Sequence, residues 1–109
     1  MQTYYYVLAS QRFLLEEEQI PEVLKERHRH YQEQAKAIDF WLVVQPAFLE
    51  APELQSVKAE CPQPAAAIIS TNLQFIQWLK LRLEYVLTGE FSAPSTTIAD
   101  PLASLVTSS

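Results

Sequence analysis

The sequence predicts a single α/β (α+β) domain, in which one sheet of three to four strands, mainly antiparallel or mixed, has helices packed against it. Runs of branched and aromatic residues that fit strands alternate with segments whose apolar residues recur at helical spacing. Apolar content of 49% and charged content of 19% are ordinary globular values. A chain of 109 residues is one domain. We place this domain at residues 1–91, followed by a weakly packed Ser/Thr/Pro-rich tail at residues 92–109.

The first strand is predicted at residues 3–10 (TYYYVLAS), which are rich in aromatic and branched side chains. One face carries Tyr4, Tyr6 and Leu8, and the other carries Tyr5, Val7 and Ala9. Residues 11–15 fit either a turn or a short further strand. A helix is predicted over residues 21–36, with proline at its first position. Its apolar stripe consists of Val23, Leu24, Tyr31 and Ala35.

The central stretch, residues 38–54, organises the rest of the chain. Residues 38–45 alternate as a strand whose two faces are both largely apolar, which indicates cover on two sides. Asp39 and Phe40 stand at the open start of this strand, where they can present one charge and one anchor to a partner. The plain alternative is that Asp39 ends the strand facing water. Phe48 continues the apolar run after the strand has stopped, and we include it among the partner-binding candidates.

The second half of the chain contains two further helices and a strand. Residues 52–60 fit a short helix, residues 61–64 a proline-rich loop, and residues 65–70 (AAAIIS) a strand. A long helix is predicted from Thr71, whose spacing to Gln74 is that of a capping box. Gly89 is expected to end this helix, since it is the single glycine of the chain.

One flank of the last predicted helix carries more apolar surface than a core requires. Trp78, Arg82 and Tyr85 are spaced i, i+4, i+7, and these residue types dominate the energetically important positions of protein interfaces. They are therefore partner-binding candidates. The alternative is that both aromatic residues complete the core while Arg82 pairs with a carboxylate such as Asp39.

Charge and composition exclude several classes of protein. A net charge of −5 argues against a nucleic-acid binder and against a polybasic membrane anchor. No apolar run approaches the roughly 20 residues of a transmembrane helix. Strand-like residues begin at Thr3 and leave no room for a targeting peptide. The single cysteine excludes an internal disulfide and fits a reducing compartment. We expect a cytosolic, soluble protein.

Residues with catalytic or metal-binding potential are few, so we expect neither an enzyme nor a cofactor or metal site. His28 and His30 are two positions apart on a helix and cannot chelate one metal. The sequence contains no Glu-x-x-His pair of the di-iron type and no phosphate-binding loop. Cys61-Pro62 is a dipeptide that some haem sensors use as an axial thiolate, although a structural loop cysteine is the simpler interpretation.

Long segments of the chain resemble one family. These are TYYYVLAS, RHRHYQEQAKAIDFWLVVQPAFLEAPEL, CPQPAAAIIST and QFIQWLKLRLEYVLTGEF. They are similar to the small accessory protein of the magnesium-protoporphyrin IX monomethyl ester oxidative cyclase, which occurs in cyanobacteria and plastids. The resemblance covers about residues 2 to 94.

The resemblance implies a non-catalytic role in chlorophyll synthesis, as an accessory or assembly factor of the cyclase. The implied partner is the membrane-associated di-iron cyclase subunit. The implied location is the cyanobacterial cytoplasm or plastid stroma, peripheral to the thylakoid membrane; a weak homo-oligomer is left open. Two alternatives stay in play: a tetrapyrrole carrier or sensor with Cys61, His28 or His30 as ligand, and an unrecognised enzyme.

Overall fold

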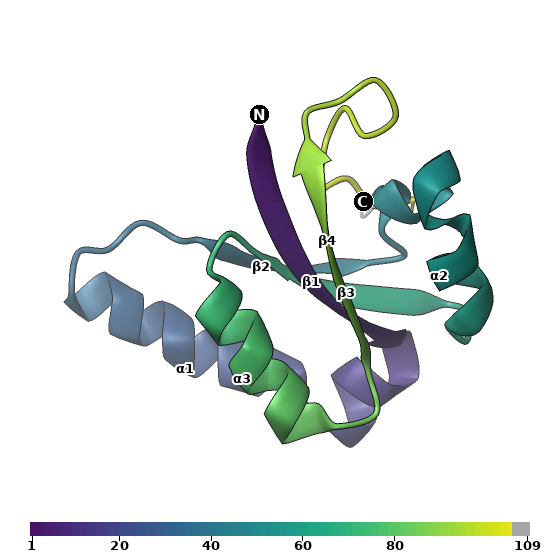
Figure 1. Ribbon diagram of the computed structural model, residues 1–109. Helices are drawn as coiled ribbons and strands as arrows, with labels where there is room; N and C mark the ends of the chain where they lie inside the picture. The colour runs from purple at the N-terminus through teal and green to yellow at the C-terminus, as the bar shows by residue number, and fades with distance from the viewer. Residues whose placement is uncertain (106–109) are drawn as a thin grey trace.

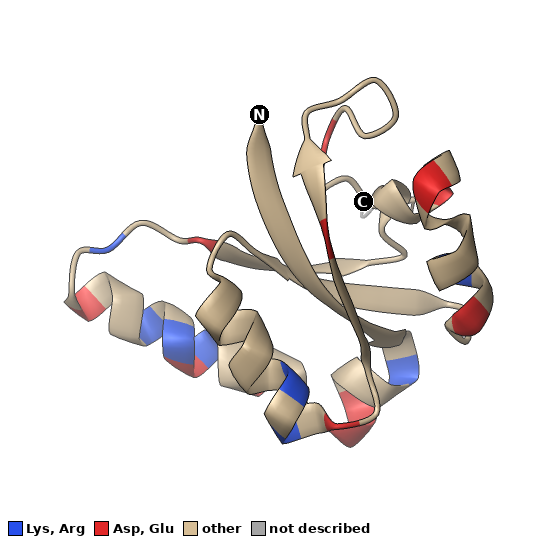
Figure 2. Ribbon diagram, in the orientation of Figure 1, with Lys and Arg blue, Asp and Glu red and all other residues tan. Residues whose placement is uncertain are grey.

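The computed structural model describes residues 1–105, which form one antiparallel sheet of four strands with helices packed on both faces (Figure 1). The strand order is β2-β3-β1-β4, so β2 and β4 are the edges. The strands are β1 (Gln2–Ser10), β2 (Phe40–Val44), β3 (Ala65–Ser70) and β4 (Leu87–Ala93). The helices are α1 (Ile20–Glu33), α2 (Gln55–Glu60) and α3 (Leu73–Leu83). Figure 2 shows that charged residues lie mainly on the helices and turns, whereas the strands carry few.

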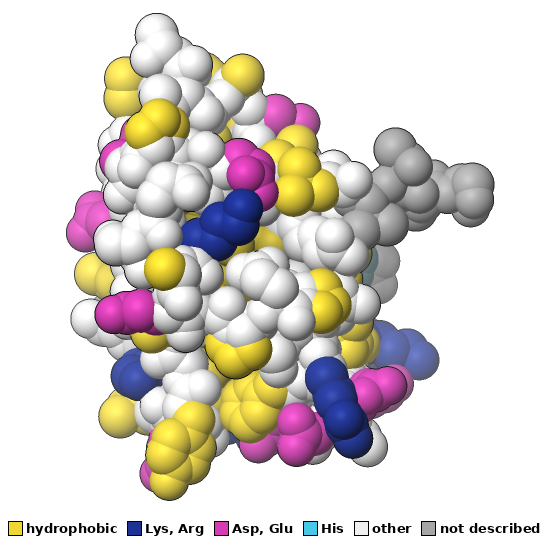
Figure 3. All heavy atoms as spheres, turned by 90° about the vertical axis from the view of Figure 1, so that its right-hand side faces the viewer, with side chains coloured by type: hydrophobic (Ala, Val, Ile, Leu, Met, Phe, Trp, Pro, Cys, Tyr) yellow, Lys and Arg dark blue, Asp and Glu magenta, His cyan; other side chains and the backbone are white. Residues whose placement is uncertain are grey.

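The sheet separates two hydrophobic clusters. In Figure 1, α1 and α3 lie side by side below the sheet, and α2 lies on its other side. The cluster under α1 and α3 includes Val7, Phe40, Ile68 and Leu79, and the opposite cluster includes Tyr6. On the side of the molecule that carries α2, hydrophobic side chains lie scattered among charged and polar ones (Figure 3). The sheet is therefore covered on both faces, as the apolar pattern of residues 38–45 predicted.

The predicted faces of the first strand are confirmed. Tyr6 and Leu8 belong to the cluster on the α2 side, with Tyr4 packed against it, while Val7 and Ala9 belong to the cluster under α1 and α3. Strand β3 is buried along its whole length, because it lies between β1 and β2 and is covered above and below. Its three alanines fit this position, since small side chains let both layers approach closely.

The prediction of one helix from Thr71 to Gly89 is wrong. Helix α3 begins after Asn72, whose side-chain Oδ1 accepts a hydrogen bond from the Phe75 backbone N–H at 3.2 Å. It ends at Leu83, because Glu84 adopts a left-handed φ of 61°. The chain then reverses and runs as β4 alongside β1. The fourth strand is therefore β4, and residues 13–17 form a short π-helical turn in place of the further strand considered for residues 11–15.

Two element ends also differ from the expectation. Helix α1 ends at Glu33, and Ala35 lies beyond it with a φ of 52°, exposed and outside the apolar stripe. Strand β2 begins at Phe40 and not at residue 38, although the Asp39 carbonyl still accepts hydrogen bonds from the Thr71 N–H at 3.1 Å and from Ser70 Oγ at 2.7 Å. The start of β2 is thereby tied to the segment that leads into α3.

Up to residue 105, the predicted tail packs against the domain and is not a weakly packed extension. Ile98 is buried in the cluster on the α2 side. The Ala47 N–H donates to the Ala103 carbonyl, and the Leu105 N–H donates to the Gln45 carbonyl, both at 2.8 Å. The folded domain therefore extends past the predicted boundary at residue 91, while residues 106–109 of the predicted tail lie outside the described residues.

Gly89→Ala is expected to lower the free energy of unfolding by about 1–3 kcal/mol, because the site has no room for a methyl group. A Cβ atom at this position would lie 2.4 Å from the Tyr6 Oη. Tyr6 is 2% exposed and its ring packs against those of Phe48 and Phe91, which hinder any movement away from the added methyl group. Urea unfolding measures the change. Ser92→Ala, on the exposed side of the same strand, is the control and should change stability by less than about 0.5 kcal/mol; equal effects of both substitutions would contradict the clash.

Candidate functional site

Asp39 lies at the start of β2 and is held by a chain of side-chain hydrogen bonds from α1. The Tyr31 hydroxyl donates to Asp39 Oδ1 at 2.9 Å, and Arg27 Nη2 donates to the Tyr31 hydroxyl at 2.9 Å. Arg27 and Tyr31 are four residues apart and therefore share one face of α1. The carboxylate of Asp39 is thus oriented by a tyrosine that is itself oriented by an arginine.

Arg27 also connects α1 to the aromatic residues of α3. Its guanidinium carbon lies 3.8 Å from the ring centroid of Phe75 and 5.4 Å from that of Phe40. Arg27 Nε is buried and has no hydrogen-bond partner among the described residues. The guanidinium can be held there because a planar, weakly hydrated cation stacks well on aromatic rings.

The contacts continue from Phe75 to the exposed side of α3. The rings of Phe75 and Trp78 stack with centroids 6.1 Å apart, and Arg82 Cζ lies 5.8 Å from the Trp78 ring. Trp78 is 47% exposed and Arg82 is exposed. We refer to the residues linked in this way as the α1–α3 face: Arg27, Tyr31, Asp39, Trp78 and Arg82. The structure therefore links Asp39, Trp78 and Arg82 by one chain of side-chain contacts, which passes through the buried rings of Tyr31 and Phe75.

Three other predicted site residues are placed elsewhere. Phe40 is 4% exposed and packs edge-to-face on Tyr31 and Phe75, so it belongs to the core beneath this surface. Phe48 is 1% exposed in the cluster on the α2 side, because a 3-10 turn at Ala47–Glu50 folds it back onto the sheet. Tyr85 is 84% exposed, but it follows the end of α3 and does not share the flank of Trp78 and Arg82.

The expected alternative partner of Arg82 is also wrong. Asp39 receives its hydrogen bond from Tyr31, and the arginine behind that tyrosine is Arg27. Sequence analysis overlooked Arg27, although a signal was present: the position lies within the predicted apolar stripe of α1, between Val23 or Leu24 and Tyr31. A cation inside an apolar stripe indicates a paired or stacked charge, because an isolated buried charge is strongly unfavourable.

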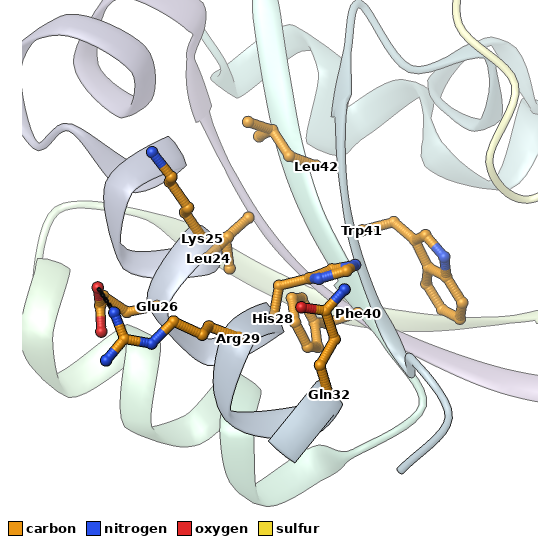
Figure 4. A pocket seen from close by; sticks show the side chains of 9 residues that line it. All are labelled: Leu24, Lys25, Glu26, His28, Arg29, Gln32, Phe40, Trp41 and Leu42. Atoms are coloured by element: carbon orange, nitrogen blue, oxygen red, sulfur yellow. Dashed lines mark ion pairs between the residues drawn. The ribbon is translucent and has the colours of Figure 1, made fainter. Parts of the chain in front are cut away.

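A groove of ≈ 490 Å³ lies beside the α1–α3 face, between α1 and the free edge of β2. Figure 4 shows side chains of α1 on one wall and three successive residues of β2 on the other. His28 and Gln32 lie next to each other there, close to Phe40, while Trp41 points to the opposite side of the strand. The His28 ring meets Phe40 edge-on, with centroids 6.4 Å apart.

The candidate tetrapyrrole ligands do not converge. Cys61 is buried in the cluster on the α2 side, and its thiol donates to the Pro62 carbonyl at 3.6 Å. His28 is exposed on α1, and its ring meets Phe40 of the cluster under α1 and α3. Within residues 1–105, no three His, Cys, Asp or Glu side chains are grouped so that they could hold a metal ion. In the same part of the chain no helix has the length and apolar character needed to cross a membrane.

Burial raises the pKa of the Cys61 thiol above its ordinary value of 9.0. As the pH rises above 9.0, the unfolded chain loses this proton before the folded chain does, so the free energy of unfolding falls. Urea unfolding at increasing pH should therefore show a steeper loss of stability for the parent than for Cys61→Ala. Burial also raises the pKa of Tyr6, but Tyr6 is present in both proteins, so the difference reports on Cys61. Parallel pH curves would contradict a buried, neutral thiol.

Comparison with known proteins identifies the family. The family model described as Ycf54 protein matches residues 2–93, which is most of the chain. The chain belongs to the Ycf54 family. The match spans β1 to β4 and therefore includes every residue of the α1–α3 face.

Members of the Ycf54 family are similar to this chain in sequence and in structure. The Ycf54-like protein of Synechocystis is 69% identical over 105 residues, covering 96% of this chain and 79% of that protein. The chloroplastic YCF54 protein of Arabidopsis thaliana is 39% identical, over 93% of this chain and 46% of that protein. The crystal structure of the All0216 protein from Nostoc superposes with a TM-score of 0.95 at 80% identity, covering 96% of this chain and 97% of that one. The Ycf54 family thus occurs in cyanobacteria and in chloroplasts, as the resemblance implied.

Proposed function

We propose that this chain is a non-catalytic accessory factor of the magnesium-protoporphyrin IX monomethyl ester oxidative cyclase. It acts by binding the membrane-associated di-iron cyclase subunit through the α1–α3 face. Through this partner it lies at the periphery of the thylakoid membrane, in the cyanobacterial cytoplasm or the plastid stroma.

The observation that supports this proposal is the construction of the α1–α3 face. Trp78 and Arg82 are exposed, but Trp78 stacks on the buried ring of Phe75, which also carries the stacked Arg27. Arg82 in turn lies over the Trp78 ring, and these contacts restrict the conformations of both side chains. Side chains held in place before binding lose little conformational entropy when a partner covers them. An exposed Trp–Arg pair that is held by packing against the core is the arrangement expected of a protein-binding surface.

Co-purification tests the proposal directly. A tagged copy of the chain is expressed in a cyanobacterium, thylakoid membranes are solubilised in mild detergent, and the proteins that remain with the tag are identified by mass spectrometry. The di-iron cyclase subunit is expected among them. Recovery of other proteins in its absence would overturn the proposal.

Trp78→Ala is expected to reduce recovery of the cyclase subunit, with a loss of binding energy of more than about 1 kcal/mol, or roughly fivefold in affinity. Leu73→Ala is the matched control, since Leu73 is a similarly exposed hydrophobic residue of the same helix and lies outside the α1–α3 face. Both variants should fold, as judged by circular dichroism. Equal recovery of the cyclase subunit with the two variants would show that Trp78 is not part of the interface.

A further inference from the structure

The outer edge of β2 carries backbone groups that no strand of the described chain pairs. Antiparallel neighbours alternate between hydrogen-bonded and non-hydrogen-bonded pairs. The Thr71 N–H donates to Asp39, and the Gln45 N–H donates to Ala65, so the odd-numbered positions of this strand pair with β3. The N–H and C=O groups of Phe40 and Leu42 therefore point away from β3, toward the open edge. Residues 1–105 provide no backbone partner for them.

The C-terminal part of the described chain contacts the other end of β2, near Val44. Ser104 Oγ donates to the Val44 carbonyl, and Ser104 forms an antiparallel bridge with Pro46. The Leu105 N–H donates to the Gln45 carbonyl at 2.8 Å. Backbone of the tail thus pairs with residues 45–47, directly after β2, and the described part of the tail stops short of Leu42. The groups of Phe40 and Leu42 lie beyond this pairing.

Beside these free groups lies the groove between α1 and β2 (Figure 4). Its apolar lining comes from Leu24, Phe40 and Leu42, which lie on the side of the sheet covered by α1. A strand placed along β2 would direct alternate side chains into this groove, because side chains alternate across a strand.

The rim of the groove carries charges of both signs, and one of its cations has no ion pair. Lys25 and Arg29 line it together with Glu26 and His28. Arg29 lies within ion-pair distance of Glu26 and Glu33, whereas Lys25 has no ion-pair partner among residues 1–105. Lys25 is exposed and is therefore available to an incoming carboxylate.

We propose that the β2 edge at Phe40–Leu42 binds an extended segment of a partner protein as a fifth strand of the sheet. The segment has an apolar side chain that enters the groove and an acidic residue that meets Lys25. A second copy of this chain fits less well, since its own β2 strand, Phe40–Val44, carries no acidic residue that could meet Lys25. This mode of binding goes beyond the proposed function, and it does not depend on which protein supplies the strand.

The test uses a synthetic probe, an acetylated eight-residue peptide of alternating glutamate and valine, titrated into ¹⁵N-labelled protein. Amide hydrogen exchange and chemical shifts are read residue by residue. In the free protein, the amides of Phe40 and Leu42 are expected to exchange fast and those of Trp41 and Val43 slowly. The peptide is expected to slow exchange at Phe40 and Leu42 at least tenfold. A variant that ends at Leu105 is titrated in parallel, because residues 106–109 lie outside the described part of the chain.

Two matched controls distinguish strand addition from nonspecific binding of the peptide. The same peptide with alternate backbone nitrogens methylated cannot extend a sheet and should give no protection. Lys25→Glu should weaken binding of the glutamate peptide by about fivefold and favour a lysine–valine peptide instead.

Three results would overturn the proposal. The first is an equal response to the methylated peptide. The second is the absence of any effect at Phe40 and Leu42 at millimolar peptide, in both the full chain and the shortened variant. The third is protection of these amides in a free protein that sediments as a dimer, which would assign the edge to a second copy.

Discussion

Phe48→Ala is expected to lower the free energy of unfolding by about 3–5 kcal/mol, the range for truncating a buried phenylalanine. Phe48 is 1% exposed and stacks on Phe91 with ring centroids 4.6 Å apart. Its ring also meets Tyr6, at 5.2 Å. Truncation leaves a cavity between the sheet and the 3-10 turn that carries Phe48, because neither can collapse without breaking backbone hydrogen bonds. Urea unfolding followed by circular dichroism measures the change.

Leu81→Ala is the control for this substitution. Leu81 is 79% exposed on α3, so its truncation should change stability by less than about 0.5 kcal/mol. If Phe48→Ala unfolded at the same urea concentration as the parent but lost its partner, the original assignment of Phe48 to a binding surface would be restored.

Arg82→Ala is expected to weaken binding of the cyclase subunit by about 2 kcal/mol or more, roughly thirtyfold, while the protein melts within a few degrees of the parent. Arg82 is exposed and no carboxylate lies within ion-pair distance of it in residues 1–105, so its removal leaves no buried group without a partner. Its guanidinium carbon lies 5.8 Å from the Trp78 ring. The guanidinium can stack on this ring and still offer its donors to a carboxylate of the partner. Pull-down recovery and a thermal melt measure the two quantities.

Two variants show whether the effect belongs to Arg82 itself. Arg12→Ala also removes an exposed arginine, but one that pairs with Glu16 away from the α1–α3 face, and it should leave recovery of the cyclase unchanged. Arg82→Lys keeps the charge without the planar donor group, so it should restore binding only in part. A stable Arg82→Ala protein that retains the cyclase in full would remove Arg82 from the interface.

Local pattern was sufficient for much of the fold. The alternation of residues 3–10 assigned β1 and the face of each of its side chains, because the direction of a side chain in a strand depends only on its parity. The alternation of residues 38–45 likewise predicted cover on both sides, while the proline-rich loop at residues 61–64 marked the start of β3. The spacing of Trp78 and Arg82 placed both on one flank of α3, since residues four apart on a helix are neighbours.

Local pattern failed where a distant segment determined the conformation. Residues 87–93 carry no strong strand signal, and Gly89 is compatible with a helix end. They form β4 because pairing with β1 satisfies their backbone groups, and because Gly89 leaves the space that the Tyr6 side chain occupies. In the sequence, Phe48 is an apolar residue that follows the end of a strand, so it was assigned to a binding surface. The structure buries it, because contacts with the sheet fix the turn that carries it.

By itself, the sequence determined the α/β class, three of the four strands, and the positions of Asp39, Trp78 and Arg82 as candidates for binding. Only the tertiary structure decided that one chain of contacts links these three. The residue that joins them is Arg27, which reaches Asp39 through Tyr31 on one side and Trp78 through Phe75 on the other. These contacts join α1, β2 and α3, so they cannot be predicted from the periodicity of any single helix or strand. They exist because the sheet holds both helices against the same face.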